Sequence, residues 1–361
     1  MAETAPNAIL SARILWSSGT GNSRRAALWV AEELAQRGVR ACVAGMEQPL
    51  EADDDGPDSK LLGLCFPTHG FTAPWSVLSF TWRLPSGKGL PAFVLATRAG
   101  GWYLVGYLPG FAGTAAWLPA LLLWLKGYKV LGLTGLDMPS NWLLIHPGMN
   151  TRHQQFFQRL AESKCRRFSA RILHGPRWIW TPWNLAELLL GIVCLPISIG
   201  YLLFGRFYLA KLFFANERCN GCAQCAENCP RQAIRMDGVP QRPYWTFNCE
   251  SCMRCMAFCP QRAVESSQSL ALLYTWCVLL LPTAWILKRT PEPYGGILAD
   301  SFQWAAGLLL VWALYTTFTR LIRIRPILAI ASRTTFTRWY RRHREAGTSL
   351  KVFRSKDPGN G

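Results

Sequence analysis

Eight of the thirteen cysteines lie in one stretch of the chain, in two copies of one pattern. The first copy, CNGCAQCAENCP, begins at Cys219, and the second, CESCMRCMAFCP, begins at Cys249. Thiolates at two-residue intervals can surround one face of an iron–sulfur cubane when the backbone curls tightly, and iron in such a cluster prefers soft thiolate ligands. The spacing therefore predicts [4Fe-4S] chemistry, in which each cluster carries one electron at a time.

Zinc knuckles and a disulfide framework are the alternative interpretations of these cysteines. Structural zinc usually takes two cysteine pairs separated by a longer loop, whereas here four cysteines fall within eleven residues. Disulfides need an oxidising compartment, and the N-terminus, MAETAPNAILSARILW, shows no secretory signal pattern. We therefore favour iron–sulfur ligation.

The two runs resemble those of bacterial-type ferredoxins with two [4Fe-4S] clusters. In that group the fourth cysteine of each run ligates the other cluster. The resemblance implies one ligand set of Cys219, Cys222, Cys225 and Cys259, and a second of Cys249, Cys252, Cys255 and Cys229. The scattered remainder lie in apolar or helical surroundings, where a free cysteine is expected to behave as a small hydrophobe: Cys42, Cys65, Cys165, Cys194 and Cys277.

A second candidate site lies near the N-terminus, where a predicted strand (14–16) meets a turn and then an amphipathic helix that ends near Gly38. Backbone N–H groups and hydroxyls at such a turn can bind a phosphate at the helix N-terminus. The turn lacks the Gly-Lys-Ser/Thr of a Walker loop and the glycine spacing of the dinucleotide fingerprint. Its residues are Ser18, Gly19, Thr20, Gly21, Asn22 and Ser23.

Further loops follow predicted strands 61–66, 92–96 and 129–133. In a doubly wound sheet, ligand-binding loops lie at the carboxyl ends of the strands. The first loop contains Pro67, Thr68, His69, Gly70 and Phe71, the second contains Thr97, Arg98, Ala99, Gly100 and Gly101, and the third spans 137–141.

With these motifs, residues 9 to about 265 resemble a fusion of a flavodoxin-like domain with a two-cluster ferredoxin, a family sometimes called ferrodoxins. The matching motifs are SGTGNS, FPTHGF, the Gly-Gly loop, MPSN and the eight cysteines. The resemblance implies an FMN phosphate on the loop 18–23 and the isoalloxazine ring between the loops 67–71 and 97–101. For His69 it leaves open a proton-handling role or a role in stabilising the turn.

Composition indicates membrane contact, because half of the residues are hydrophobic and uncharged runs span 188–205, 266–287 and 301–319. The net charge of +18 is concentrated beside these runs, with seven Lys and Arg against one acidic residue in 151–182 and eleven against two in 320–361. Basic flanks of apolar runs predict cytoplasmic segments on an anionic lipid surface, and they exclude nucleic acid as the favoured partner.

The predicted fold class is an α/β flavodoxin-like doubly wound parallel sheet, with a small α+β two-[4Fe-4S] ferredoxin domain and α-helical membrane segments. The predicted order is an FMN-binding domain (1–150), a basic helix and linker (151–182), a membrane-associated or re-entrant hairpin (183–214), the ferredoxin domain (215–265), transmembrane helices (266–288 and 297–319) and a basic cytoplasmic tail (320–361). This places a multi-pass protein in the cell's inner membrane with both redox domains facing the cytoplasm.

One stretch departs from a flavodoxin, since no charged residue lies between Arg98 and Lys126. Either a sheet-covering helix with an insertion, or an insertion in contact with the membrane, would account for it. A hairpin that turns at Pro196 would keep flavin and clusters on one side of the membrane, whereas a single crossing would separate them.

These parts together predict an electron carrier between a cytosolic low-potential donor and a membrane-bound redox enzyme or quinone. The sequence shows no evident catalytic triad and no paired carboxylates, and this favours an electron carrier over an enzyme with its own substrate. Two alternatives stay open at this point, a flavin-dependent reductase acting on a quinone or lipid-like substrate, and a redox or oxygen sensor.

Overall fold

The computed structural model describes residues 9–48, 60–103, 106–144, 146–175, 177–276 and 297–354. Two compact units share the chain. We call the first the α/β unit, which comprises 1–141, 148–202 and 343–361. We call the second the cysteine-rich unit, which comprises 142–147 and 203–342. The chain therefore enters each unit more than once, and the C-terminal residues from 343 onward belong to the α/β unit.

A five-stranded parallel sheet forms the centre of the α/β unit, with the strand order β2-β1-β3-β4-β7. Its strands are β1 (Ser11–Trp16), β2 (Arg40–Gly45), β3 (Lys60–Pro67), β4 (Pro91–Ala99) and β7 (Lys129–Met138). This 2-1-3-4-5 arrangement is the flavodoxin-like doubly wound order. The prediction of a doubly wound parallel sheet is therefore confirmed.

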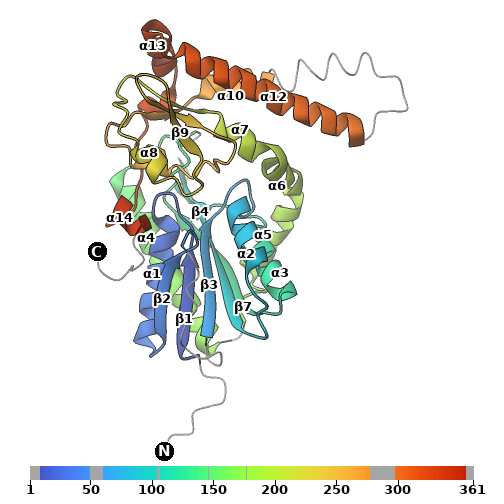
Figure 1. Ribbon diagram of the computed structural model, residues 1–361. Helices are drawn as coiled ribbons and strands as arrows, with labels where there is room; N and C mark the ends of the chain where they lie inside the picture. The colour runs from blue at the N-terminus through green and yellow to red at the C-terminus, as the bar shows by residue number, and fades with distance from the viewer. Residues whose placement is uncertain are drawn as a thin grey trace, which may run out of the picture. The chain divides into compact units, whose positions relative to one another are not determined.

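Helices cover both faces of this sheet, as a parallel sheet requires. Helix α1 (Asn22–Gln36) packs against α4 (Thr151–His174), and α2 (Trp75–Arg83) packs against α3 (Trp117–Leu125). Figure 1 shows the two pairs on opposite faces. The core between sheet and helices consists of fully buried aliphatic and aromatic side chains, among them Leu64, Phe66 and Val94.

The uncharged stretch 99–125 divides into a short hairpin and a helix. The hairpin pairs β5 (Gly101–Tyr103) with β6 (Gly106–Leu108), and α3 follows it. Ala120 and Leu123 of α3 are buried in the core of the sheet, so the stretch contains a sheet-covering helix and an insertion. Helix α5 (Pro182–Val193) and helix α6 (Leu195–Gly200) come after α4 in the chain.

The cysteine-rich unit contains two small antiparallel ladders. Strand β8 (Phe213–Ala215) pairs with β11 (Val264–Ser266), and β9 (Ile234–Asp237) pairs with β10 (Arg242–Trp245). The helical segments of this unit are α7 (Arg206–Ala210), α8 (Gln224–Glu227), α9 (Arg254–Ala257), α10 (Gln268–Thr275), α12 (Ile297–Leu321), α13 (Arg325–Arg333) and the short η4 (Phe336–Arg338). A π-helical turn, η2 (Tyr201–Gly205), lies where the two units meet in sequence, and α14 (Leu350–Arg354) belongs to the α/β unit.

The predicted transmembrane helices find no support in the described ranges. Taken one at a time, the helices there are too short or too polar to cross a bilayer. Two bent pairs meet the same length and composition test, Pro182–Val193 with Leu195–Ala210 at 66° and Ala305–Leu321 with Arg325–Arg333 at 117°. Of the predicted span 266–288, the structure describes residues 266–276, which contain the end of β11 and helix α10. The rest of this span lies outside the described residues.

Candidate functional site

The two cysteine runs fold into the same local structure. Residues Ala223 and Met253 have left-handed φ values of 58° and 65°, and each directly precedes a one-turn helix, α8 or α9. Left-handed residues also follow each Cys-Pro pair, at Gln232 and Arg262. These reversals curl the backbone tightly, as ligand runs at two-residue intervals require.

The fold brings the eight cysteines together in two groups. Electrostatic interaction links Cys225 with Cys219, Cys222 and Cys259. In the other group, Cys249 interacts with Cys252 and Cys229, and Cys255 interacts with all three of these and also with Cys225. Each group thus contains three cysteines of one run and the fourth cysteine of the other, and the two groups lie near one another.

Backbone N–H groups point at sulfur in corresponding places of the two runs. The amide of Ala233 donates to Cys229 Sγ at 3.3 Å, and the amide of Ala263 donates to Cys259 Sγ at the same distance. A further amide, that of Ser251, donates to Cys249 Sγ at 3.4 Å. Hydrogen bonds of this kind stabilise negative charge on sulfur and raise the reduction potential of a cluster.

Burial makes these thiols hard to ionise without a bound cation. Desolvation, with a smaller contribution from neighbouring Cys219 and Cys259, raises the pKa of Cys225 to about 12. Burial also raises the pKa values of Cys249 and Cys255 well above the usual range. Iron coordination deprotonates such thiols, so this donor set fits a metal cluster. Among the described residues, no three metal-ligating side chains lie close enough together to bind a single metal ion. A cubane does not need such an arrangement, because each of its four ligands binds a different iron atom.

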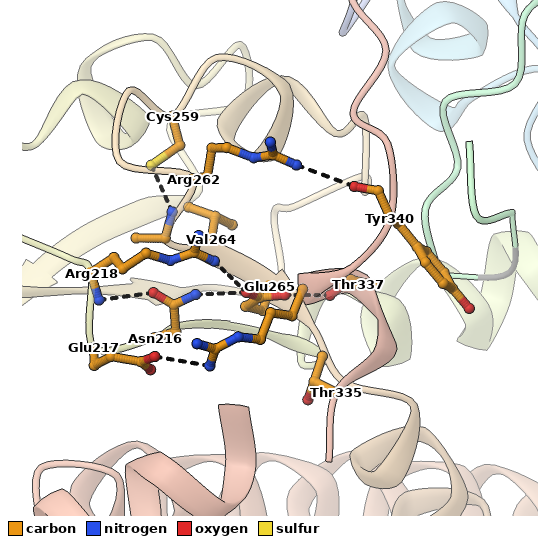
Figure 2. Close-up of polar contacts among 12 residues, drawn as sticks. Asn216, Glu217, Arg218, Cys259, Arg262, Val264, Glu265, Thr335, Thr337 and Tyr340 are labelled. Carbon is orange, nitrogen blue, oxygen red and sulfur yellow. Dashed lines mark hydrogen bonds and ion pairs between the residues drawn. The ribbon is translucent and has the colours of Figure 1, made fainter. Parts of the chain in front are cut away.

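A buried carboxylate ties together the two ends of the cysteine-rich stretch. Glu265 accepts hydrogen bonds from Asn216 Nδ2 at 2.6 Å and from Thr337 Oγ1 at 2.7 Å, and Arg218 lies at 3.4 Å (Figure 2). Burial raises the pKa of Glu265, although these donors oppose the shift. The side chain thus joins the residues before Cys219 and after Cys259 to the C-terminal segment around Thr337.

In the α/β unit, the loop 18–23 follows β1 and opens α1, as predicted. Its side chains already have protein partners. Ser18 Oγ accepts from the Gly21 amide at 2.9 Å, Ser23 Oγ shares a 2.8 Å hydrogen bond with Thr97 Oγ1, and Asn22 Nδ2 donates to the Pro139 carbonyl at 2.8 Å. The whole loop is buried.

The C-terminal segment 343–353 covers this loop. The Glu345 amide donates to the Thr20 carbonyl at 2.9 Å, and His343 Nε2 lies 2.8 Å from Asn22 Oδ1. A Cβ atom on Gly21 would stand 2.5 Å from Thr348 Oγ1 and 2.8 Å from Glu345 Cβ, so the segment and the loop are in direct contact. We call 343–353 the covering segment.

Two aromatic and polar contacts hold the covering segment in place. The ring of Phe353 packs edge-on against Trp16 at 5.6 Å between centroids. The Glu345 carboxylate accepts from Gln158 Nε2 of α4 at 2.9 and 3.1 Å. Nothing in the basic composition of 320–361 indicated these contacts, and sequence reasoning missed them.

The loop 67–71 is also in contact with another part of its own unit. His69 Nδ1 lies 3.1 Å from the Tyr201 hydroxyl, and Ser198 Oγ donates to the Gly70 carbonyl at 3.0 Å. A Cβ atom on Gly70 would meet the Tyr201 ring at 2.6 Å. Burial lowers the pKa of His69 to about 4, so its imidazole is neutral at pH 7.

Arg98 of the loop 97–101 points into the protein. Its guanidinium binds Asp137 through two hydrogen bonds of 2.9 and 3.0 Å and forms an ion pair with Glu187 of α5. Asp137 also accepts from the Tyr107 hydroxyl at 2.9 Å. A Cβ atom on Gly100 would stand 2.2 Å from the Phe157 ring. Arg98 and Gly100 thus meet protein groups, and the loop leads into the β5–β6 hairpin.

Position and chemistry fit a flavin phosphate at the loop 18–23, whereas the covering segment does not leave room for one. Three buried hydroxyls of the unit, on Thr68, Ser140 and Thr348, have no partner among the described residues. They could serve a ligand, but all six residues of the loop are buried under protein. A phosphate can therefore reach the loop only after the covering segment moves.

Comparison with known protein families supports iron–sulfur ligation by the cysteine-rich unit. Residues 218–264 match the family model described as a 4Fe-4S dicluster domain. A search of curated proteins gives no match.

Among solved structures, the chain is similar to flavodoxin 1 from Bacillus cereus, at 16% identity and a TM-score of 0.29, over 45% of this chain and 96% of that one. It is also similar to a flavodoxin from the domain Archaea, at 13% identity and a TM-score of 0.24, over 44% and 97% of the two chains. The flavodoxin-like fold assigned above rests on the strand order of this chain itself.

Proposed function

We propose that this protein transfers single electrons through two [4Fe-4S] clusters held by the cysteine-rich unit. The observation that carries the proposal is the pair of four-cysteine groups, each completed by the fourth cysteine of the other run. Each cluster, when bound, supplies a one-electron redox centre. Because Cys255 interacts with Cys225 of the other group, the two centres would be close enough to exchange electrons.

The residues around the cysteines supply the environment for this chemistry. The amides of Ala233, Ala263 and Ser251 donate to cysteine sulfur, and Cys249 and Cys255 lie deep in the unit. Amide donors and low water access set the reduction potential of a cluster. Ion pairs and hydrogen bonds around Glu265 hold the two ends of the ligand-bearing stretch together.

We further propose that the α/β unit binds FMN at the loop 18–23 in a state in which the covering segment has moved away. FMN exchanges electrons in pairs or singly, and it would connect a two-electron donor to one-electron clusters. Support comes from the flavodoxin-like strand order and from the hydroxyl-rich loop at the N-terminus of α1. Truncation after residue 342 should then increase flavin affinity, measured by quenching of FMN fluorescence; unchanged affinity would contradict this.

Membrane attachment is also part of the proposal, through an apolar face of the α/β unit. Helices α3 and α5 lie side by side, joined by Trp117 Nε1 donating to the Asn184 carbonyl at 3.2 Å (Figure 1). Large hydrophobic side chains of both helices are exposed, with Val193 at 75% and Trp124 at 64%. Clusters of this kind mark contact with lipid or another protein. We propose that anionic lipid contacts the basic segments beside this face. We also propose that a cytosolic low-potential donor supplies the electrons and that a membrane-bound redox enzyme or quinone accepts them.

The lipid contact can be tested by flotation of the full chain with vesicles that contain phosphatidylglycerol. The triple variant L189Q/I192Q/V193Q should lose most flotation, because it removes exposed apolar area from α5. The matched control is V239Q, which changes a 96% exposed valine of the other unit and should float like the parent protein. Equal flotation of all three proteins would exclude this face as the lipid contact.

The electron-transfer proposal is tested by anaerobic reduction of the detergent-solubilised chain with dithionite, followed by EPR. Two interacting signals of reduced [4Fe-4S] clusters are expected. The variant C255S should lose or alter one of them, whereas C42S, which changes an exposed cysteine of the α/β unit, should keep both. The absence of any reduced-cluster signal from the anaerobic parent protein would refute the proposal.

A further inference from the structure

A buried lysine lies close to the second cysteine group. Lys211 follows α7, and only 1% of its surface is exposed. Among the described residues no carboxylate pairs with it. A fully buried ammonium without a carboxylate partner is unusual, because removal of the charge from water is costly.

Neutral groups surround the ammonium of Lys211. Its Nζ atom lies 4.4 Å from the ring centre of Phe247 and 4.7 Å from the ring centres of Tyr244 and Tyr315. It also donates a hydrogen bond to the carbonyl of Trp245. Faces of aromatic rings and a carbonyl stabilise a cation without neutralising it. The positive charge therefore stays available to other groups nearby.

The group that interacts electrostatically with Lys211 is Cys249, whose sulfur would be anionic when it binds iron. Burial lowers the pKa of Lys211 to about 8, and Cys249 is the group that opposes this shift. Three of the residues around the ammonium, at positions 244, 245 and 247, lie within five residues before Cys249 in the chain. Glu250, the carboxylate that also interacts with Cys249, forms an ion pair with Arg231 at 3.7 Å. A cluster on the second group would thus have beside it a buried ammonium that no described carboxylate pairs with.

The first cysteine group has a different electrostatic environment. Arg342 is the buried cation that interacts with Cys259, and the carboxylate of Glu265 interacts with the same arginine. Arg218, beside Cys219, also pairs with Glu265 and is partly exposed to water. Cations near the first group are therefore compensated by a carboxylate. The runs themselves also differ in charge, since the second has Glu250 and buried Arg254 where the first has Asn220 and Gln224.

We propose that Lys211 raises the reduction potential of the cluster on Cys249, Cys252, Cys255 and Cys229 above that of its twin. This inference rests on the proposed function, since it assumes that both clusters are present. Reduction adds one electron to a cluster and makes it more negative, with no bond formed or broken and no proton moved. A buried positive charge stabilises that reduced form, because the low local dielectric screens the interaction poorly. The first electron to enter the protein would then rest on the second cluster.

The test is an anaerobic potentiometric titration of the full chain, followed by EPR. In the variants K211M and K211Q the step at higher potential should move down, so that at a fixed potential the ratio of reduced to oxidised cluster falls about tenfold or more. A tenfold change corresponds to about 59 mV for a one-electron couple. The step at lower potential should move much less.

Two controls separate charge from packing. The variant K211R keeps the positive charge and should keep the parent potential. The variant R235M removes a charge from an exposed position in the same unit and should shift neither step, because water screens it.

Unchanged potentials in K211M and K211Q with full iron content would overturn the inference. An equal shift in K211R would also overturn it, because packing and not charge would then be the cause. Loss of iron from both neutral variants would make Lys211 an assembly residue and would likewise overturn the tuning role. If the parent protein itself contains no clusters, the proposed function fails first, and its iron content shows this before any variant is compared.

Discussion

Acidification should release the covering segment from the loop 18–23, and His343 sets the size of the effect. This side chain is 3% exposed, and burial lowers its pKa to about 4. Since Asn22 Nδ2 donates to a carbonyl, Asn22 Oδ1 must accept the hydrogen bond from His343 Nε2. The other ring nitrogen, Nδ1, is buried and has no hydrogen-bond partner among the described residues, so its protonation would place a poorly solvated charge in the protein.

The magnitude follows from the two pKa values. A released segment has an ordinary histidine pKa of about 6.5, and the docked one has a pKa of about 4. Neutral His343 therefore stabilises the docked covering segment fully above about pH 6.5, and this stabilisation is lost as the pH falls towards 4. Between pH 8 and pH 5.5 the docking equilibrium should fall about tenfold, which is about 1.4 kcal/mol. The carboxylate of Glu345, which lies 4.0 Å from Nε2, would favour the protonated imidazole and so reduce this figure.

Hydrogen exchange of the amides in 343–353 measures this release directly. Protection factors, which correct for intrinsic rates, should fall about tenfold between pH 8 and pH 5.5 in the parent protein. In the variant H343Q the amide can still donate to Asn22 but does not titrate, so the fall should disappear. His69 titrates in the same range, but its effect should appear in the peptide around residue 69. A fall of equal size in H343Q would refute the assignment to His343.

Two further changes test the contacts described above. The substitution Gly21→Ala places a Cβ atom against Thr348 and Glu345 at a left-handed residue, and it should lower the free energy of unfolding of the α/β unit by about 1–3 kcal/mol in chemical denaturation. The control Gly38→Ala changes a left-handed residue with no neighbour within 4 Å and should lower this free energy less. Equal decreases would show that backbone strain alone, and not contact with the covering segment, causes the effect at Gly21. The substitution Thr337→Val removes a hydrogen-bond donor to buried Glu265 and should lower the free energy of unfolding of the cysteine-rich unit by about 1–3 kcal/mol, seen as a lower unfolding temperature. In the background of Glu265→Gln the decrease should be smaller, and an equal decrease there would exclude this hydrogen bond as its source.

Local patterns in the sequence predicted what depends on local geometry. The spacing of the cysteines from Cys219 to Cys259 indicated cluster ligation, and a matching family model covers that stretch. The alternation of apolar strands with turns and helices indicated the doubly wound sheet, and its strand order is the expected one.

Contacts between distant parts of the chain could not be predicted in this way. The covering segment meets Asn22 across more than three hundred residues, and its basic composition indicated a solvated tail instead. Arg98 was expected beside a flavin ring, but the two carboxylates that bind it come from β7 and α5. The aromatic rings around Lys211 come from two separate parts of the chain, so no motif identifies them.

The central claim is that this chain holds two [4Fe-4S] clusters, and the iron and acid-labile sulfide content of the anaerobically purified protein tests it most directly. The account predicts about eight irons and about eight sulfides per chain, since each cubane contains four of each. About four of each would mean that only one cysteine group holds a cluster. Zinc in place of iron, with no sulfide, would contradict the account.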